Sequence, residues 1–432
     1  MIRICNFFKF FIRKSVNPFY GFIEGHWRLT NQFIRDVENE LLFPSNIFVE
    51  NFERKFSELI GDGECVAFAS GRMSFFALLK ALKVSTGDEV ILLGFTCSVM
   101  VNAVIRTGAK PVFSDIDVNT FGSSVKSIEN CISSNTKVVV AQHSFGIPCE
   151  IERIRELTIN NNIFLVEDCA ISLGSKVKGK SIGDFGDASL FSTDHSKPIN
   201  TFTGGLIYSK NSLLIEKLRF IQNQSPDLSI KKQIAIFKRL KIERKFSNPK
   251  RYYNLIRLNL IYHLIGGTSP FLDQDFGVRE NLKCDYPYPA KLPSFLAKIG
   301  IEQVENWDLV SKERKMNFSA IIEVIKNSNS SKFLPNAYFD TNLNIIPLRV
   351  VWSESNGPNI REKLSSFLHV EWTWFLFPII VTKESLENYG YFSGMCPNSE
   401  SLGIGMINIP CNHHKADVKL LCEKIKESLV DL

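Results

Sequence analysis

The sequence predicts an α/β protein in which helices cover both faces of a mostly parallel sheet. Two observations support this fold class: short β-rich runs bounded by turn residues recur from about residue 51 onward, and helical patterns separate most of them. Strands joined by helices of this length pair in parallel through right-handed crossovers. We expect strands at residues 65–69, 89–93, 111–114, 138–142, 163–167, 188–191 and 206–209, and helices at 52–60, 71–82, 98–106, 125–133 and 150–160.

The length of the chain predicts more than one folded unit. Its 432 residues, 44% of them hydrophobic, can build one large domain and a smaller one. We expect an N-terminal arm over residues 1–50, a large α/β domain over 51–300 with a helical basic insertion at about 212–281, and a small α+β domain over 301–432. In the last part the patterns predict a helix at 304–326, strands at 345–351 and 375–381, and a final helix at 416–429.

Composition narrows the class of protein. The net charge of +6 is modest and mixed in sign, which does not indicate a nucleic-acid partner. Ten cysteines without C-x-x-C spacing favour reduced thiols in a cytoplasmic protein. Residues 1–14 are apolar in part, but Lys9 and Arg13 interrupt them, so we expect neither a signal peptide nor a membrane span. A short membrane-surface helix is one alternative there; a helix packed on the body or on a partner subunit is favoured.

Small and polar residues follow the predicted strands, at the sheet edge where ligands bind in such folds. They are Ser70-Gly71-Arg72, Gly94 to Cys97, Gln142 to Ser144, Asp168 and Ser192. Ser70-Gly71-Arg72 also opens a predicted helix, where backbone N–H groups and the helix dipole favour a phosphate. The alternative is that Ser70 and Gly71 form only a cap and a turn.

Asp168 and Lys197 form the most informative pair. Asp168 ends a buried run, and Lys197 lies in the loop before the next strand. A buried carboxylate can keep a pyridine nitrogen protonated, and a loop lysine with a lowered pKa can form a Schiff base. Together they are what a pyridoxal phosphate enzyme requires.

The ordered segments resemble the DegT/DnrJ/EryC1/StrS family of pyridoxal phosphate-dependent sugar aminotransferases, most clearly over residues 64–210. The segments are FASGRMSFFALLKAL, GDEVILLGFTCSVMVNAVIRTGAKPVFSDIDVNTF, VVVAQHSFGIP, VEDCAISLGSKVKGKSIGDFGDASLFSTDHSK and TGGLIYSK. The resemblance implies fold-type I architecture, with a large sheet domain and a smaller C-terminal domain. It also implies a homodimer, because fold-type I sites are built at the subunit interface.

The resemblance implies a role for several residues. Lys197 falls at the Schiff-base lysine, Asp168 at the partner of the ring nitrogen, and Ser192 at a phosphate-binding serine. Gly71, Arg72 and Met73 fall at the phosphate cradle.

Five positions depart from the family pattern. Arg72 stands where a threonine is usual, and Cys97 replaces an aromatic residue that stacks on the ring. Ile171 replaces a glutamine, and Pro289 and Lys291 replace an asparagine and an arginine that often reach across the dimer.

The function implied by the resemblance is transfer of an amino group from an amino acid, glutamate foremost, to a keto sugar, expected to be nucleotide-linked, for surface polysaccharide or glycoconjugate synthesis. The alternative is a catalytically silent fold-type I protein that binds a ligand or partner. A different reaction on the same cofactor ranks below both. Retention of Lys197, Asp168 and Ser192 favours the enzyme. A branch of the family carries histidine in place of the lysine, but His195 lies two residues too early for that role.

Three further features are open to interpretation. Residues 231–257 hold ten basic residues against Glu243, with apolar residues between them, which fits binding of a diphosphate or an anionic membrane; a solvated face on a dimerisation or lid element is slightly favoured. His413 and His414 lack the spacing of a metal site, so we expect a solvated turn and no metal. For Trp372, Trp374 and Phe375 we expect a core or interface role rather than sugar stacking.

Overall fold

The computed structural model describes residues 28–246, 254, 258, 270–272, 284–368, 370, 375–381, 385–413 and 417–430. A seven-stranded sheet of order β1-β9-β8-β5-β4-β2-β3 lies at its centre. The strands are β1 (Glu64–Phe68), β2 (Glu89–Leu93), β3 (Lys110–Ser114), β4 (Thr136–Gln142), β5 (Phe164–Asp168), β8 (Ala188–Ser192) and β9 (Gly205–Ser209). Each lies within two residues of its predicted bounds.

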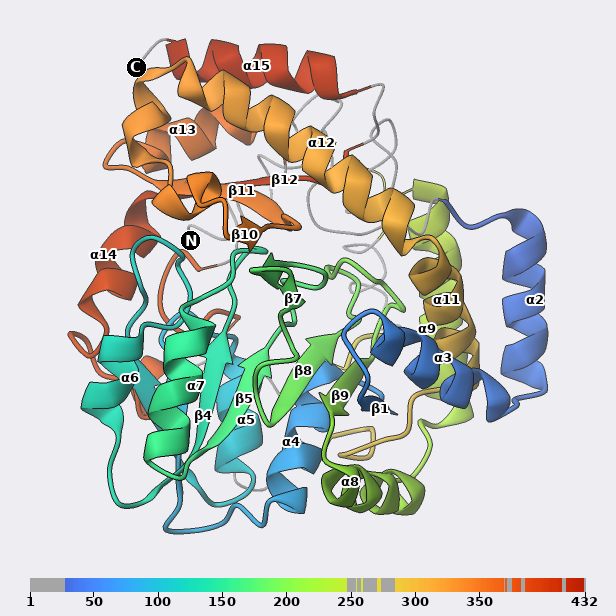
Figure 1. The fold of residues 1–432 in the computed structure, drawn as a ribbon. Coiled ribbons are helices and arrows are strands. Elements are labelled where there is room, and N and C mark those ends of the chain that lie inside the picture. The colour runs from blue at the N-terminus through green and yellow to red at the C-terminus, as the bar shows by residue number, and fades with distance from the viewer. Residues whose placement is uncertain are drawn as a thin grey trace.

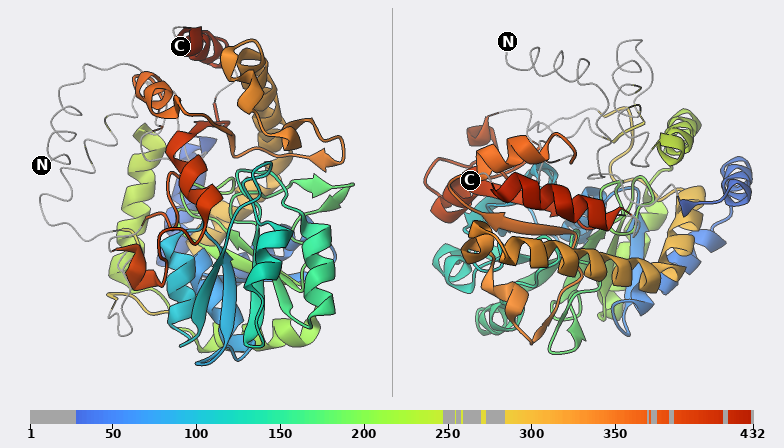
Figure 2. Two further views of the ribbon diagram at one scale, coloured as in Figure 1. Left: turned by 90° about the vertical axis from the view of Figure 1, so that its left-hand side faces the viewer. Right: turned by 90° about the horizontal axis from the view of Figure 1, so that it is seen from above.

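Helices cover both faces of this sheet, as predicted. The helices α4 (Gly71–Ala81) and α5 (Ser98–Ile105) lie on one face, and α6 (Val125–Cys131) and α7 (Ile151–Asn160) lie on the other (Figures 1 and 2). Each begins and ends close to the predicted residues. The α/β fold class is therefore confirmed.

The direction of β9 sets the position of the lysine loop. The pairs β2–β3, β2–β4, β4–β5 and β5–β8 are parallel, whereas β9 runs antiparallel to both β8 and β1. Residues 193–204 join β8 to β9 without a helix, so the chain must return antiparallel. Lys197 lies on this connection, between two buried strands.

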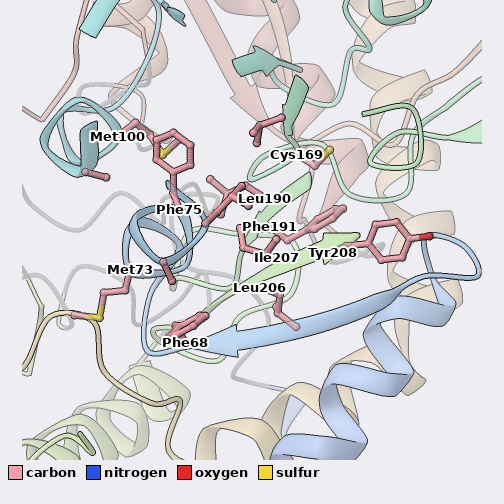
Figure 3. Packing of buried hydrophobic residues seen from close by; sticks show 14 of the residues in the cluster. Phe68, Met73, Phe75, Met100, Cys169, Leu190, Phe191, Leu206, Ile207 and Tyr208 are labelled. Atoms are coloured by element: carbon pink, nitrogen blue, oxygen red, sulfur yellow. The ribbon is translucent and has the colours of Figure 1, made fainter. Parts of the chain in front are cut away.

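Apolar side chains fill the space between α4 and the sheet. Phe75 of α4 is fully buried and lies beside Leu190 of β8 (Figure 3), and Met73 is fully buried on another side of the same helix. Leu190 and Ile207 cover the same space from the sheet. This packing fixes the first turn of α4 at the edge where β8 ends.

The C-terminal part forms a second core above the sheet (Figure 1). The strands β11 (Arg349–Ser353) and β12 (Met406–Pro410) pair antiparallel around Trp352, which is fully buried. Helices surround this pair: α12 (Trp307–Lys326), α13 (Gly357–Leu364), α14 (Pro397–Gly405) and α15 (Val418–Val430), with the 3-10 helices η3 (Asn329–Phe333) and η4 (Asn336–Phe339). In contrast, α11 (Ser294–Glu305) packs on α3 (Ile47–Glu58), and the 3-10 helix η5 (Leu386–Tyr389) packs on α5, so both belong to the core of the large sheet. The helices predicted at 304–326 and 416–429 are α12 and α15.

Two strand predictions in this part need correction. The strand predicted at 345–351 is displaced and becomes β11. The prediction of a strand at 375–381 is wrong, because Phe375, Ile379 and Val381 have φ values of 63°, 50° and 64°. The Ile379 and Ile380 N–H groups instead donate to the carbonyls of Gly94 and Thr96 over 3.0 and 2.9 Å. The segment is apolar because it covers the end of β2.

A three-stranded sheet at the rim of the molecule has no counterpart among the predicted elements. It consists of β6 (Lys176–Val177), β7 (Lys180–Ser181) and β10 (Leu343–Asn344), in the order β10-β6-β7. Two-residue strands carry no periodicity that a sequence pattern could reveal. This small sheet ties the loop after β5 to the C-terminal part.

The predicted N-terminal arm contains α2 (Asn31–Leu42) and the start of α3 (Ile47–Glu58), while residues 1–27 lie outside the described residues. The basic insertion begins with α8 (Ser212–Gln224) and α9 (Ile230–Phe246). Its basic residues do not form one solvated face, because Lys232 and Arg239 are 2% and 8% exposed. Within the described parts of the chain, no helix combines the length and apolar character that a membrane crossing needs.

Candidate active site

Asp168 occupies the end of β5, and the backbone around it is fixed by hydrogen bonds. The His143 N–H donates to the Asp168 carbonyl over 3.1 Å, and the Ala170 N–H donates to Asp168 Oδ1 over 3.0 Å. Burial raises the pKa of the Asp168 carboxyl, while the Ala170 N–H and the charge of Lys197 act in the opposite direction. A cationic ring nitrogen beside this carboxylate would keep it ionised.

Behind Asp168 lies a buried pair that sequence reasoning missed. Glu167 Oε2 is 3.1 Å from His143 Nε2 and accepts from the Gly183 N–H, and Glu167 Oε1 accepts from the N–H groups of Phe185 and Gly186. With Cys169 nearby, these residues have metal-ligating atoms within 4.8 Å of one another. Because the Glu167 oxygens already accept four hydrogen bonds, the cluster serves as a rigid support for β5.

Lys197 lies on a loop held at several points. The backbone N–H of Lys197 donates to the Asp194 carbonyl over 2.9 Å, and the backbone N–H of Thr201 donates to the Thr193 carbonyl over 2.9 Å. The Asn200 amide donates to the His195 carbonyl over 3.1 Å. Such a loop holds the lysine with little freedom, as a site that positions a reacting amine requires.

The electrostatic surroundings of Lys197 suit a nucleophilic amine. Burial lowers the pKa of the Lys197 ammonium, while Asp194, Cys97 and Asp168 oppose this effect. The predicted partners Asp168 and Cys97 therefore lie within electrostatic reach of the lysine.

The end of β8 and the start of α4 meet where the sequence predicts the phosphate cradle. A β-carbon added to Gly71 would lie 3.1 Å from the Ser192 Cβ, and one added to Gly205 would lie 2.3 Å from the Gly71 Cα. Only glycine allows the two chains to approach this closely. Ser70 caps α4, and Ser192 contacts its first residue, so a hydroxyl and a helix N-terminus meet here. This arrangement fits the phosphate of pyridoxal phosphate.

The two other predicted cradle residues have different positions. Arg72 is half-buried, and its charge acts on both Asp194 and Cys97. The Met73 side chain is fully buried in the core (Figure 3), so only its backbone could face a phosphate.

Cys97 stands before α5, where the resemblance places a ring-stacking residue. It forms an isolated bridge with Ile380, and burial raises the pKa of its thiol. Ile171 is 3% exposed and belongs to an apolar cluster with Phe95, Phe145 and Phe375. The predicted core role of Phe375 is confirmed, whereas Trp372 and Trp374 lie outside the described residues.

The remaining predicted residues lie farther along the edge. Lys291 forms a bridge with Phe68 at the end of β1, and its N–H donates to the Pro226 carbonyl over 3.0 Å. Pro289 is half-buried two residues earlier.

The solvated turn predicted at His413 is wrong. This side chain is 1% exposed, and burial with the charges of Arg349 and Arg314 lowers its pKa to about 3. It lines a cavity of about 470 Å³ together with Pro198 and Arg314. His414 lies outside the described residues.

Asp194 and His195 were missed as site residues, although both stand in the segment STDHSK. Burial acts to raise the pKa of Asp194, but His195, Lys197 and Arg72 together lower it to about 2. Asp194 is therefore an anion beside the lysine. A charged pair next to the lysine in sequence was the only signal that could have indicated this.

Residues 30–240 match the model of the DegT/DnrJ/EryC1/StrS aminotransferase family. Through these residues, just under half of the chain, the protein is similar to that family. The resemblance read from residues 64–210 is thus confirmed. Arg72, Cys97 and Ile171 are the positions at which the sequence departs from the expected pattern of the DegT/DnrJ/EryC1/StrS family.

Similar proteins extend the comparison. The GDP-perosamine synthase of Escherichia coli O157:H7 is 38% identical over 177 residues, which cover 41% of this chain and 49% of that protein. The GDP-perosamine synthase of Vibrio cholerae is 34% identical over 177 residues, 41% of this chain and 48% of that protein. The chain thus spans about half the length of these curated relatives.

The fold extends over nearly the whole chain. The solved aminotransferase from Psychrobacter cryohalolentis superposes with a TM-score of 0.72 at 18% identity, covering 96% of this chain and 99% of that one. The chain therefore has the fold of that solved aminotransferase, in agreement with the fold-type I architecture that the resemblance implied.

Proposed function

We propose that this protein is a pyridoxal phosphate-dependent aminotransferase. The observation that carries the proposal is the pairing of Lys197, whose pKa burial lowers, with the buried carboxylate of Asp168. When bound, the cofactor supplies an aldehyde that carries the amino group and a ring that accepts electrons from the reacting carbon. Lys197 would hold the cofactor and Asp168 would keep its ring nitrogen protonated.

Other residues would bind and orient the cofactor. Ser192, Gly71 and the backbone of Met73 would hold the phosphate at the start of α4, and the Arg72 guanidinium would add a charge-assisted hydrogen bond. Cys97 would lie against one face of the ring. Once substrate amine is bound, the neutral Lys197 Nζ would move the proton at the reacting carbon.

The proposed substrates are an amino acid, glutamate foremost, and a nucleotide-linked keto sugar. The names of the two GDP-perosamine synthases support an amino sugar product. A role in surface polysaccharide or glycoconjugate synthesis follows from this chemistry. A homodimer is part of the proposal because fold-type I sites lie at subunit interfaces, and a cytoplasmic location is supported by the ten scattered cysteines.

A second candidate is a catalytically silent protein that keeps the pocket for binding or regulation. The observation in its favour is that Cys97 and Ile171 offer no aromatic stacking and no amide to the cofactor. The retained Lys197 and Asp168 favour the enzyme.

Absorbance spectroscopy tests the proposal. Purified protein mixed with pyridoxal phosphate is expected to show the visible band of the lysine-bound cofactor, and Lys197→Ala to abolish it. Lys178→Ala is the matched control, because this lysine is exposed and pairs with Glu152 at the rim. If the wild-type protein gains no such band, the aminotransferase proposal is wrong. If the band forms but no nucleotide keto sugar is aminated, the silent alternative stands.

A further inference from the structure

His195 lies two residues before Lys197 and is held between aromatic rings. The centroid of its imidazole is 6.1 Å from the ring of Phe202 and 5.6 Å from that of Phe271. These two phenyl rings are themselves stacked at 5.4 Å. His195 Nδ1 is 2.9 Å from Asp194 Oδ1. The imidazole is thus fixed against the carboxylate that faces the lysine.

The insertion reaches this histidine through α9. Lys232 Nζ donates to the Phe271 carbonyl over 3.2 Å, which holds the ring-bearing segment in place. The Arg239 guanidinium lies 5.4 Å from the centroid of the same Phe271 ring. Arg239 Nε donates to Glu243 Oε1 over 2.8 Å. Helix α9 therefore holds the segment of Phe271 that packs on His195, and it also carries the Arg239–Glu243 ion pair.

The Arg239–Glu243 pair is too deeply buried to be explained by stability alone. The two side chains are 9% and 0% exposed. Removing two charges from water costs more than their mutual attraction commonly returns, so a buried pair is a poor stabilising element. Its effect on the charge of a neighbouring group is a better explanation.

Charged groups act on His195 from each element packed against it. The lysine loop contributes Asp194, α9 contributes Glu243 and Arg239, and α4 contributes Arg72 through its effect on Asp194. Burial acts to lower the pKa of His195, but Asp194 and then Glu243 raise it above its usual value, against the opposing charge of Arg239. The histidine therefore carries a proton over a wider pH range than a solvated one.

We propose that His195 is a positioning residue of the active site, and that α9 maintains its positive charge through Glu243. The imidazolium compensates Asp194, so that the Asp194 carboxylate does not hold Lys197 as an ammonium. Lys197 is then available as a neutral amine near neutral pH. The statement about Lys197 rests on the proposed function, whereas the coupling between Glu243 and His195 does not.

The coupling is tested on the cofactor-free protein. Histidine-selective NMR gives the pKa of His195, with the resonance assigned by its loss in His195→Gln. Glu243→Gln is expected to lower this pKa, because it removes a negative charge that favours the imidazolium. Glu38→Gln is the matched control: this carboxylate pairs with Lys241 of the same helix over 3.4 Å, but both side chains are 46% exposed.

A second variant guards against misfolding, since Glu243→Gln leaves a buried arginine without its carboxylate. In Arg239→Met/Glu243→Gln the pair is replaced by neutral groups, and the pKa of His195 is expected to fall by less than in Glu243→Gln, because the loss of the Arg239 charge acts in the opposite direction. If His195 titrates in both variants as it does in Glu38→Gln, the inference is overturned.

The consequence for the lysine has its own measurement. The rate at which the apoprotein captures pyridoxal phosphate depends on the fraction of Lys197 that is a neutral amine, so it is measured as a function of pH. In His195→Gln the midpoint of this pH profile is expected to move to higher pH, and the rate at pH 7 is expected to fall roughly tenfold. An unchanged profile contradicts the positioning role. If wild-type protein captures no cofactor, the proposed function fails, while the NMR titration still decides the coupling.

Discussion

At the scale of single residues, the proposed site contains several charged side chains, and only some of them could be predicted from the sequence. Asp168 and Lys197 could be predicted because each stands at the end or start of an apolar run, where the α/β pattern fixes its place. Glu243 could not, since it is 48 positions away from His195 and only the packing of the insertion brings them together. His413 was misjudged because a pair of histidines near a chain end gives no sign of burial.

Asp168 offers a prediction about stability and pH. Its folded pKa is raised by burial, so this carboxyl increasingly destabilises the cofactor-free fold as the pH rises from its unfolded pKa to its folded pKa. Asp168→Asn keeps the acceptor for the Ala170 N–H and is expected to raise the unfolding free energy of the apoprotein at pH 7 by on the order of 1 kcal/mol. The gain should shrink as the pH falls through the folded pKa. Urea unfolding at several pH values measures it.

The same substitution should weaken function. An asparagine cannot hold the proton on a ring nitrogen, so amino transfer by Asp168→Asn should fall by at least about a hundredfold. A variant that is less stable than wild type at pH 7, or equally active, would contradict the role given to this carboxylate.

At the scale of elements, the junction of α4, β8 and β9 depends on glycine. A β-carbon at Gly205 would meet the backbone of Gly71 at 2.3 and 2.4 Å, and neither chain can move without displacing a buried strand. Gly205→Ala should therefore cost about 2–4 kcal/mol of unfolding free energy and loosen the phosphate cradle. Gly179→Ala is the control that measures the cost of backbone strain without a steric clash, because Gly179 has a φ of +85° and open space around it. That control should cost only about 1 kcal/mol. Equal losses in the two variants would show that the close approach is unimportant.

Elements were predicted well where burial and periodicity agree. The strands of the large sheet are continuous apolar runs bounded by turns, and each was found within two residues. The run at 375–381 has the same composition, yet its backbone turns three times into positive φ to cover the end of β2. An apolar composition indicates that a segment is buried, but not that it pairs with another strand. The sequence therefore could not distinguish the run at 375–381 from the strands of the large sheet.

At the scale of the whole molecule, two cores are joined by a third apolar cluster. The core of the sheet and the core around Trp352 hold separate residues. The joining cluster takes Phe95 and Phe145 from the loops of the sheet and Val351 and Met406 from the C-terminal pair. The proposed site lies beside this junction, because Ile171 belongs to the joining cluster and Cys97 packs against it.

The proposed division into domains at residues 51–300 and 301–432 can be tested through this arrangement. Ile360 is fully buried in α13 within the second core, and Leu165 is fully buried in β5 within the first. Each change to alanine should cost about 2–5 kcal/mol. If the parts unfold separately, Ile360→Ala should lower amide-exchange protection in β11, β12 and α15 while β4 and β5 keep theirs, and Leu165→Ala should do the reverse. Uniform loss of protection across both cores in either variant would show a single cooperative unit, and the domain boundary at residue 300 would then have no energetic meaning.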